Sequence, residues 1–181
     1  MRIHPATTLL AVVDIQDRLL AVIPTAADIV ARATRLAQAA GLLGVRSILA
    51  EQYPRGLGRT PAALASLLPP ALAKTTFSCC GCEPFAAVID APGPEPLETV
   101  VLCGLETHVC IAQTALDLLA RGLGVFITVD AVTSRHALDH EVALRRLEGA
   151  GAILTTSEAV LFEWCRSAEH PQFQSVRRLV L

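Results

Sequence analysis

A cysteine near the start of a predicted helix is the residue best suited to covalent chemistry. Cys110 follows the apolar stretch 99–103 and Gly104, and it lies in the first turn of a helical pattern that runs from Thr107 to Arg121 and ends at Gly122. The amides and the dipole at a helix N-terminus stabilise a thiolate, so we expect the Cys110 thiol to be a nucleophile with a pKa below that of a free cysteine. The alternative is a structural role, because free cysteines are often small buried hydrophobic residues.

Two charged residues could serve such a nucleophile. Asp14 ends the apolar run 9–13, and Lys74 follows the apolar stretch 70–73. The apolar neighbours of Lys74 suggest partial burial, and a buried ammonium requires a charge partner. An acid, a lysine and a cysteine that each lie near the end of a strand form a hydrolytic constellation. The alternative is that charged residues end strands because loops are solvated, and Asp14 could equally cap the next helix.

The elements that must bring these residues together alternate between strand and helix. A weak strand ends at Lys74, and five further segments have the continuous apolar character of buried parallel strands: residues 9–14, 46–50, 99–104, 125–130 and 152–155. Helical patterns cover residues 26–43, 107–121, 139–148, 155–164 with a capping box at 155–158, and a short helix within 170–181. This alternation predicts an α/β fold, with a doubly wound, mostly parallel sheet of about six strands and helices on both faces. Ligands bind at the carboxyl edge of such sheets, which is where Asp14, Lys74 and Glu106 fall.

The composition favours one domain over residues 1–181. Hydrophobic residues make up 52% of the chain and aromatic residues 4%, and the Pro-rich segment 90–96 is too short to be a domain linker. The net charge of -2 argues against a nucleic-acid partner, and the apolar runs are too short to span a membrane. Without a signal-like N-terminal segment, we expect a cytoplasmic protein whose six cysteines stay reduced.

The cluster Cys79-Cys80-Gly81-Cys82 raises the question of a metal site. A structural zinc site usually has two separated pairs of ligands, and no second pair matches this cluster. We expect these thiols to lie in a loop beside the pocket, with thiol redox sensing as the alternative role.

Three segments together resemble the signatures of the isochorismatase-like cysteine hydrolases. They are residues 12–16 (Val-Val-Asp-Ile-Gln), Lys74 with Phe77, and residues 104–110 (Gly-Leu-Glu-Thr-His-Val-Cys). The segments 114–122, 129–135 and 155–158 extend the resemblance over nearly the whole chain. Residues 51–54, 56–58 and 170–173 are most similar to the isochorismatase-domain-containing branch, whose substrate is unassigned.

This resemblance implies a three-layer α/β/α fold and a catalytic triad of Asp14, Lys74 and Cys110. Asp14 would act as general base on the thiol, Lys74 would hold Asp14, and Cys110 would form a covalent intermediate. The resemblance also implies a cis peptide bond between Leu105 and Glu106, which would aim the backbone amides of Glu106 and Cys110 at an oxyanion. We expect substrate contacts from Gln16, Leu19, Gln52, Tyr53, Phe77 and Leu105.

The segment after the second strand departs from the metal-binding members of the family. Nicotinamidases have an Asp-x-His pair there, whereas this chain has Glu51-Gln52-Tyr53, and tyrosine is a poor zinc ligand. We therefore predict a cysteine hydrolase without metal or other cofactor that cleaves a C–N bond of the amide type in a small molecule. The alternatives are cleavage of a vinyl ether such as isochorismate, and a non-catalytic scaffold. The apolar residues Phe173, Val176 and Leu179 of the C-terminal segment predict a homo-oligomer.

Overall fold

One six-stranded parallel sheet organises the chain. The computed structural model describes residues 1–91 and 95–181, so the predicted Pro-rich connection at 90–96 lies partly outside the described residues. The strands are β1 (Thr8–Val13), β2 (Arg46–Gln52), β3 (Leu72–Lys74), β4 (Thr99–Leu105), β5 (Gly124–Thr133) and β6 (Ile153–Thr155). They pair in the order β3-β2-β1-β4-β5-β6, and every pair is parallel. The predicted doubly wound sheet is therefore confirmed, with its switch in strand order between β1 and β4.

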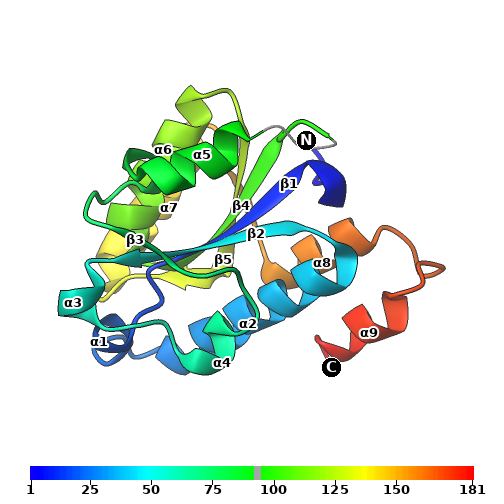
Figure 1. Ribbon diagram of the computed structural model, residues 1–181, viewed down its shortest axis with the longest axis horizontal. Coiled ribbons are helices and arrows are strands. Elements are labelled where there is room, and N and C mark those ends of the chain that lie inside the picture. The colour runs from blue at the N-terminus through cyan, green and yellow to red at the C-terminus, as the bar shows by residue number, and fades with distance from the viewer. Residues whose placement is uncertain (92–94) are drawn as a thin grey trace.

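Helices cover both faces of this sheet (Figure 1). One face carries α5 (Glu83–Asp90), α6 (Ala112–Ala120) and α7 (Ala137–Gly149). The other face carries α2 (Ala26–Leu43), α8 (Ser157–Cys165) and α9 (Phe173–Arg178). Three helices of one turn lie in the connections: α1 (Asp17–Leu20), α3 (Pro54–Leu57) and α4 (Ala62–Ala65). The expected three-layer α/β/α architecture is thus confirmed.

The central strand β1 supplies apolar side chains to both layers. Leu10 and Val12 belong to the core that includes residues of α2 and α8, whereas Leu9, Ala11 and Val13 belong to the core that includes residues of α6. All six residues of β1 are buried. A strand of a parallel sheet that is covered on both faces has this continuous apolar character, which is why the sequence revealed it.

Several boundaries differ from the predicted ones. The helix predicted over 107–121 begins as a π-helical turn at Thr107–Ile111 and continues as α6. The helix α8 begins one residue later than the predicted capping box requires, because the Thr156 hydroxyl accepts the hydrogen bond from the Ala159 amide. The strand β5 extends to Thr133, and its pairing with β4 shifts register between Leu102 and Gly104. This shift lies beside the π-helical turn that carries Cys110.

The C-terminal segment packs against its own chain. Val176 of α9 is fully buried, and the rings of Phe162 and Phe173 lie 6.4 Å apart. Leu179 is partly buried against the same core. The apolar face that predicted a homo-oligomer is therefore used within the chain, and the oligomer stays a prediction that this segment does not support.

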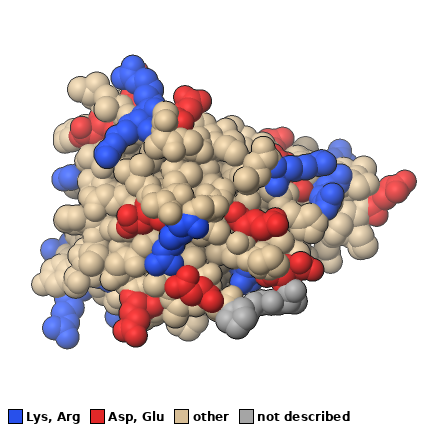
Figure 2. All heavy atoms as spheres, turned by 90° about the horizontal axis from the view of Figure 1, so that it is seen from above, with Lys and Arg blue, Asp and Glu red and all other residues tan. Residues whose placement is uncertain are grey.

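The outer surface mixes acidic and basic side chains. On the face seen in Figure 2, charged residues of both signs are interspersed among uncharged ones, with no basic stripe on the part of that face that is described. Within residues 1–91 and 95–181, no helix has both the length and the apolar character needed to cross a membrane.

Candidate active site

Three strands end in residues with a left-handed backbone, and these turns define the site. Asp14 follows β1 with a φ of 56°, Tyr53 follows β2 with a φ of 37°, and Glu106 follows β4 with a φ of 59°. Residues other than glycine rarely adopt this conformation, and such positions concentrate at functional sites. The close approach of β1 and β4 depends on Gly104, because a Cβ there would collide with the Val13 carbonyl.

Asp14 and Lys74 form a buried ion pair behind the pocket. The Lys74 Nζ lies 2.8 Å from Asp14 Oδ2, and each side chain is only 1% exposed. The ammonium also donates to Gln52 Oε1 at 2.7 Å and to the Phe77 carbonyl at 3.1 Å. These bonds satisfy a charge that burial would otherwise penalise, and they fix the position of Oδ2.

Gln16 fixes the ends of β1 and β2 relative to each other. Its side-chain amide donates to the carbonyls of Gln52 at 3.0 Å and Gly58 at 2.7 Å, and its oxygen accepts from the Gln52 amide at 2.8 Å. Gln16 is fully buried and does not line the pocket. The predicted substrate contact is therefore replaced by a positioning contact on Gln52, which does line the pocket.

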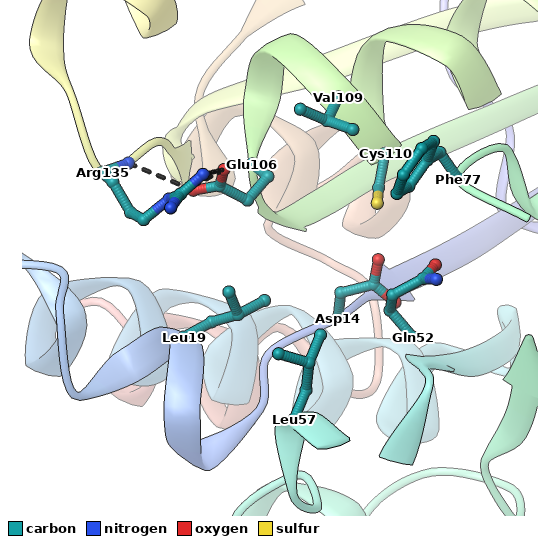
Figure 3. A pocket seen from close by; sticks show the side chains of 9 residues that line it. All are labelled: Asp14, Leu19, Gln52, Leu57, Phe77, Glu106, Val109, Cys110 and Arg135. Atoms are coloured by element: carbon teal, nitrogen blue, oxygen red, sulfur yellow. Dashed lines mark hydrogen bonds and ion pairs between the residues drawn. The ribbon is translucent and has the colours of Figure 1, made fainter. Parts of the chain in front are cut away.

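The Cys110 sulfur points toward the Asp14 carboxylate (Figure 3). Cys110 is 5% exposed and is carried by the π-helical turn before α6. Among the described residues, Asp14 Oδ1 is buried without a conventional hydrogen-bond partner, and the Cys110 thiol lies next to the Asp14 carboxylate. One carboxylate oxygen is thus held by Lys74, and the other faces the thiol.

The expected low pKa of the Cys110 thiol is contradicted. Burial, followed by the negative charge of Asp14, raises the pKa of Cys110 well above its ordinary value, and the Lys74 ammonium only partly opposes this. Burial and a carboxylate neighbour arise from tertiary structure, so the position of Cys110 near a helix N-terminus does not reveal them. The resting nucleophile is a protonated thiol, so a base must remove its proton during attack.

The charge states of Asp14 and Lys74 suit that task. Burial raises the pKa of the Asp14 carboxyl, although the Lys74 ammonium counteracts it. Burial alone would lower the pKa of Lys74, but the negative charge of Asp14 opposes this, and the pKa of Lys74 is raised. Lys74 therefore stays an ammonium, and Asp14 is a stronger base than a solvated aspartate.

A pocket of about 260 Å³ opens onto this group at the carboxyl edge of the sheet. One end of the pocket is lined by Asp14, Cys110, Gln52 and Phe77 (Figure 3). The middle is lined by the apolar side chains of Leu19, Leu57 and Val109, and the other end by the ion pair of Glu106 and Arg135. Of the predicted substrate contacts, the structure therefore brings Leu19, Gln52 and Phe77 to the pocket.

Two other predicted contacts lie elsewhere. Leu105 is fully buried in the core that includes residues of α2, and Tyr53 is 54% exposed and lines a separate surface depression with Lys74. Three lining residues were not predicted: Leu57, Val109 and Arg135. Each falls in a segment that carried the family resemblance, which was the available signal, but their side-chain directions depend on the fold.

The cis peptide bond expected between Leu105 and Glu106 is absent, and the described residues contain no cis peptide bond. The chain reverses instead through the left-handed conformation of Glu106, which is followed directly by the π-helical turn. The Glu106 carbonyl accepts hydrogen bonds from the amides of Val109 at 2.9 Å and Ile111 at 3.4 Å. A trans peptide followed by a left-handed residue thus makes the turn.

The residues weighed as metal ligands have other partners or positions. The Glu51 carboxylate is buried and accepts from Arg59 Nη1 at 2.9 Å and from the Thr60 amide at 2.8 Å. Cys79 is fully buried beside the pair, its amide donates to the Thr114 hydroxyl, and burial raises the pKa of its thiol to about 12. All six cysteines are free thiols.

The fold and this site define an α/β protein with a buried Asp-Lys pair facing a thiol. Residues 8–159 match the family of the isochorismatase domain. The chain therefore belongs to the isochorismatase domain family, and this membership supports a hydrolase.

Relatives extend over almost the whole chain. It is 42% identical over 182 residues to isochorismatase domain-containing protein 1 of Danio rerio, covering 98% of this chain and 62% of that protein. It is 43% identical over 180 residues to isochorismatase domain-containing protein 2 of Bos taurus, covering 99% and 85%. The chain thus spans less than two thirds of the length of the Danio rerio relative.

Solved structures show the same fold. The MAR1 ribonuclease of Caenorhabditis elegans has a TM-score of 0.93 and 39% identity, covering 99% of this chain and 92% of that one. A cysteine hydrolase of Pseudomonas syringae has a TM-score of 0.77 and 23% identity, covering 91% and 95%, which shows a shared fold alone.

Proposed function

We propose that this protein is a cysteine hydrolase that cleaves a C–N bond of the amide type in a small molecule without a metal ion. The observation that carries the proposal is the arrangement of Asp14. Its Oδ2 is held by Lys74 at 2.8 Å, and its buried Oδ1 faces the Cys110 sulfur. A carboxylate with one fixed oxygen and one oxygen next to a protonated thiol is placed to act as a general base.

The first half of the reaction forms a thioester. Asp14 accepts the thiol proton while the Cys110 sulfur attacks the amide carbon, and the carbonyl oxygen becomes an oxyanion. We assign the oxyanion to the backbone amides of Glu106 and Cys110, which follow the left-handed turn at the end of β4. When the intermediate collapses, the C–N bond breaks, and the amine leaves with the proton that Asp14 held.

The second half releases the acid. Asp14, again a carboxylate, takes a proton from water while the water oxygen attacks the thioester carbon. Collapse of this intermediate breaks the C–S bond, and the proton returns to the Cys110 sulfur. Lys74 stays protonated throughout, and its bonds to Asp14 and Gln52 keep the base in place.

A ligand without net charge suits this pocket better than a polyanion. The lining carries the carboxylates of Asp14 and Glu106 and the guanidinium of Arg135. The name ribonuclease belongs to the Caenorhabditis elegans structure. An RNA phosphodiester here would find the Asp14 carboxylate paired with Lys74 and the Glu106 carboxylate paired with Arg135, so no unpaired cation among the lining residues would receive it. Since the Glu51 carboxylate is occupied by Arg59 and Thr60, we assign no metal to activate water.

The test is turnover of a panel of small amides and carbamoyl compounds, with isochorismate and a short RNA as further substrates. We expect amide hydrolysis that Cys110→Ser and Asp14→Asn reduce by roughly 10²-fold or more, the range for general base catalysis. Cys79→Ser is the matched control, because Cys79 is a buried thiol near Lys74 that does not line the pocket. Near-normal turnover by both Cys110→Ser and Asp14→Asn would reject the mechanism and favour ether cleavage or another chemistry.

A further inference from the structure

The end of the pocket away from Cys110 is a fixed ion pair. The Glu106 carboxylate accepts from the Arg135 amide at 3.2 Å and from Arg135 Nε at 3.2 Å, and Arg135 Nη2 also lies 3.2 Å from Glu106 Oε2. The Glu106 side chain is 8% exposed, whereas that of Arg135 is 48% exposed. The carboxylate is thus anchored by backbone and side chain together, and it holds the guanidinium at the pocket wall.

This wall offers hydrogen bonds without net charge. A guanidinium has five N–H donors, and the contacts with Glu106 use only those on Nε and Nη2, which leaves donors for a ligand. The Glu106 oxygens retain lone pairs that a ligand donor could use. His108 Nε2 lies 3.9 Å from Glu106 Oε2 and 3.9 Å from Asp139 Oδ2. A second carboxylate, that of Asp139, is therefore present near the Glu106–Arg135 pair.

The charged side chains along the pocket are already paired, which disfavours a ligand with an anionic tail. The charge of Asp14 is matched by Lys74, and the charge of Glu106 is matched by Arg135. A carboxylate on the ligand would give up its hydration and meet the Glu106 carboxylate, and the one cationic side chain among the lining residues, Arg135, is already paired. A primary amide, a ureido group or a hydroxyl can accept from Arg135 and donate to Glu106 without that cost.

We infer that the Glu106–Arg135 pair is a specificity site for a neutral polar group at the far end of the substrate. The inference rests on the proposed function, since it defines the rest of the molecule whose amide meets Cys110. The substrate class is a short aliphatic amide with an uncharged hydrogen-bonding tail. Its aliphatic middle contacts Leu19, Leu57 and Val109.

Three ligands of equal size test the tail. Glutaramide has a neutral amide tail, 5-methylhexanamide replaces that tail with an isosteric apolar group, and glutaramate carries a carboxylate. Their dissociation constants are measured by NMR titration on Cys110→Ala protein, which keeps the pocket wall and cannot turn over. We expect glutaramide to bind on the order of tenfold more tightly than glutaramate, because a bond from a charged donor is gained without repulsion.

Variants of the pair isolate the contribution of Arg135. In the Cys110→Ala background, Arg135→Met should lower the affinity for glutaramide about tenfold and leave that for 5-methylhexanamide nearly unchanged. Arg135→Met alone leaves the Glu106 carboxylate unpaired, so the double variant Glu106→Gln/Arg135→Met removes that charge as well. It should give the same change in the ratio of the affinities for glutaramide and 5-methylhexanamide. Arg145→Met is the control, because Arg145 pairs with Glu141 on the exposed side of α7, away from the pocket.

The outcomes separate this inference from the proposed function. An unchanged affinity ratio on Arg135→Met, tighter binding of glutaramate, or no binding of any of the three ligands would overturn the specificity site. Hydrolysis of glutaramide by the unmodified protein is measured in a separate assay. A changed ratio of dissociation constants without hydrolysis of glutaramide supports the tail site and counts against glutaramide as a substrate. Hydrolysis that Cys110→Ser abolishes, with an unchanged ratio, supports the cysteine chemistry and rejects the tail site.

Discussion

Lys74 Nζ lies 2.8 Å from Asp14 Oδ2, and both side chains are almost completely buried. This single contact gives the two carboxylate oxygens different roles. Oδ2 is held by an ammonium, and Oδ1 is left beside the Cys110 sulfur without a conventional hydrogen-bond partner among the described residues. The proposed chemistry depends on that asymmetry.

Asp14→Asn should increase the fraction of Cys110 that is thiolate and should nevertheless lower turnover. The negative charge of Asp14 raises the pKa of Cys110, so its removal should lower that pKa and increase the thiolate fraction at pH 8. Turnover should still fall, because the base is gone. Thiolate absorbance near 240 nm, taken as the difference from the matching Cys110→Ser protein, follows the titration. A Cys110 pKa that does not fall would show that the carboxylate does not act on the thiol.

The acid limb of the kcat/KM profile should report the ionisation of Asp14. Burial raises the pKa of Asp14 above 3.8, and the reaction needs the carboxylate. Activity is therefore complete above the raised pKa and falls as the pH decreases through it. We expect a midpoint above 3.8 that disappears in Asp14→Asn. A limb that persists in that variant would belong to another group.

Lys74→Ala should be more destabilising than Asp14→Asn. It leaves a buried carboxylate without its cation, which costs about 3–5 kcal/mol of unfolding free energy for a buried pair. Lys74→Met combined with Asp14→Asn removes both charges, and asparagine tolerates the left-handed backbone at position 14. We expect this double variant to recover most of the loss in urea unfolding. Equal stability of Lys74→Ala and the unmodified protein would contradict a buried pair.

Gln16→Ala should affect stability and activity through Gln52. The substitution leaves the Gln52 backbone amide and the partly buried carbonyls of Gln52 and Gly58 with fewer partners, which costs about 1–3 kcal/mol. Gln52 would then hold Lys74 less firmly, so kcat should fall more than KM rises. Gln38→Ala on the exposed side of α2 is the matched control and should lie within about 0.5 kcal/mol of the unmodified protein. An unchanged kcat would limit Gln16 to a purely structural role.

Much of the sheet could be predicted because its strands are buried on both faces. Residues 9–13 read as one apolar run, and the structure buries all of β1. The one-turn helices α1, α3 and α4 are too short to show a helical period, so they could not be predicted from hydrophobic periodicity. The π-helical turn before α6 was also hidden, since it arises from the turn at Glu106.

The site could be predicted in its charged residues and less well in its surroundings. Asp14 and Lys74 were found because strand ends converge at one edge of the sheet, and the structure places them 2.8 Å apart. Arg135 and Val109 were missed because their direction depends on the turns after β5 and β4. The pKa of Cys110 was predicted in the wrong direction, since burial and the charge of Asp14 outweigh a helix N-terminus.

The central claim is that Cys110 becomes acylated during turnover. The most direct measurement is rapid acid quenching of the protein with its fastest amide substrate, followed by intact mass and peptide mass spectrometry. We predict a mass increase equal to the acyl group on the peptide that contains Cys110, removed by hydroxylamine and missing in Asp14→Asn. Steady turnover with no adduct under conditions that trap a thioester, together with full activity of Cys110→Ser, would contradict the account.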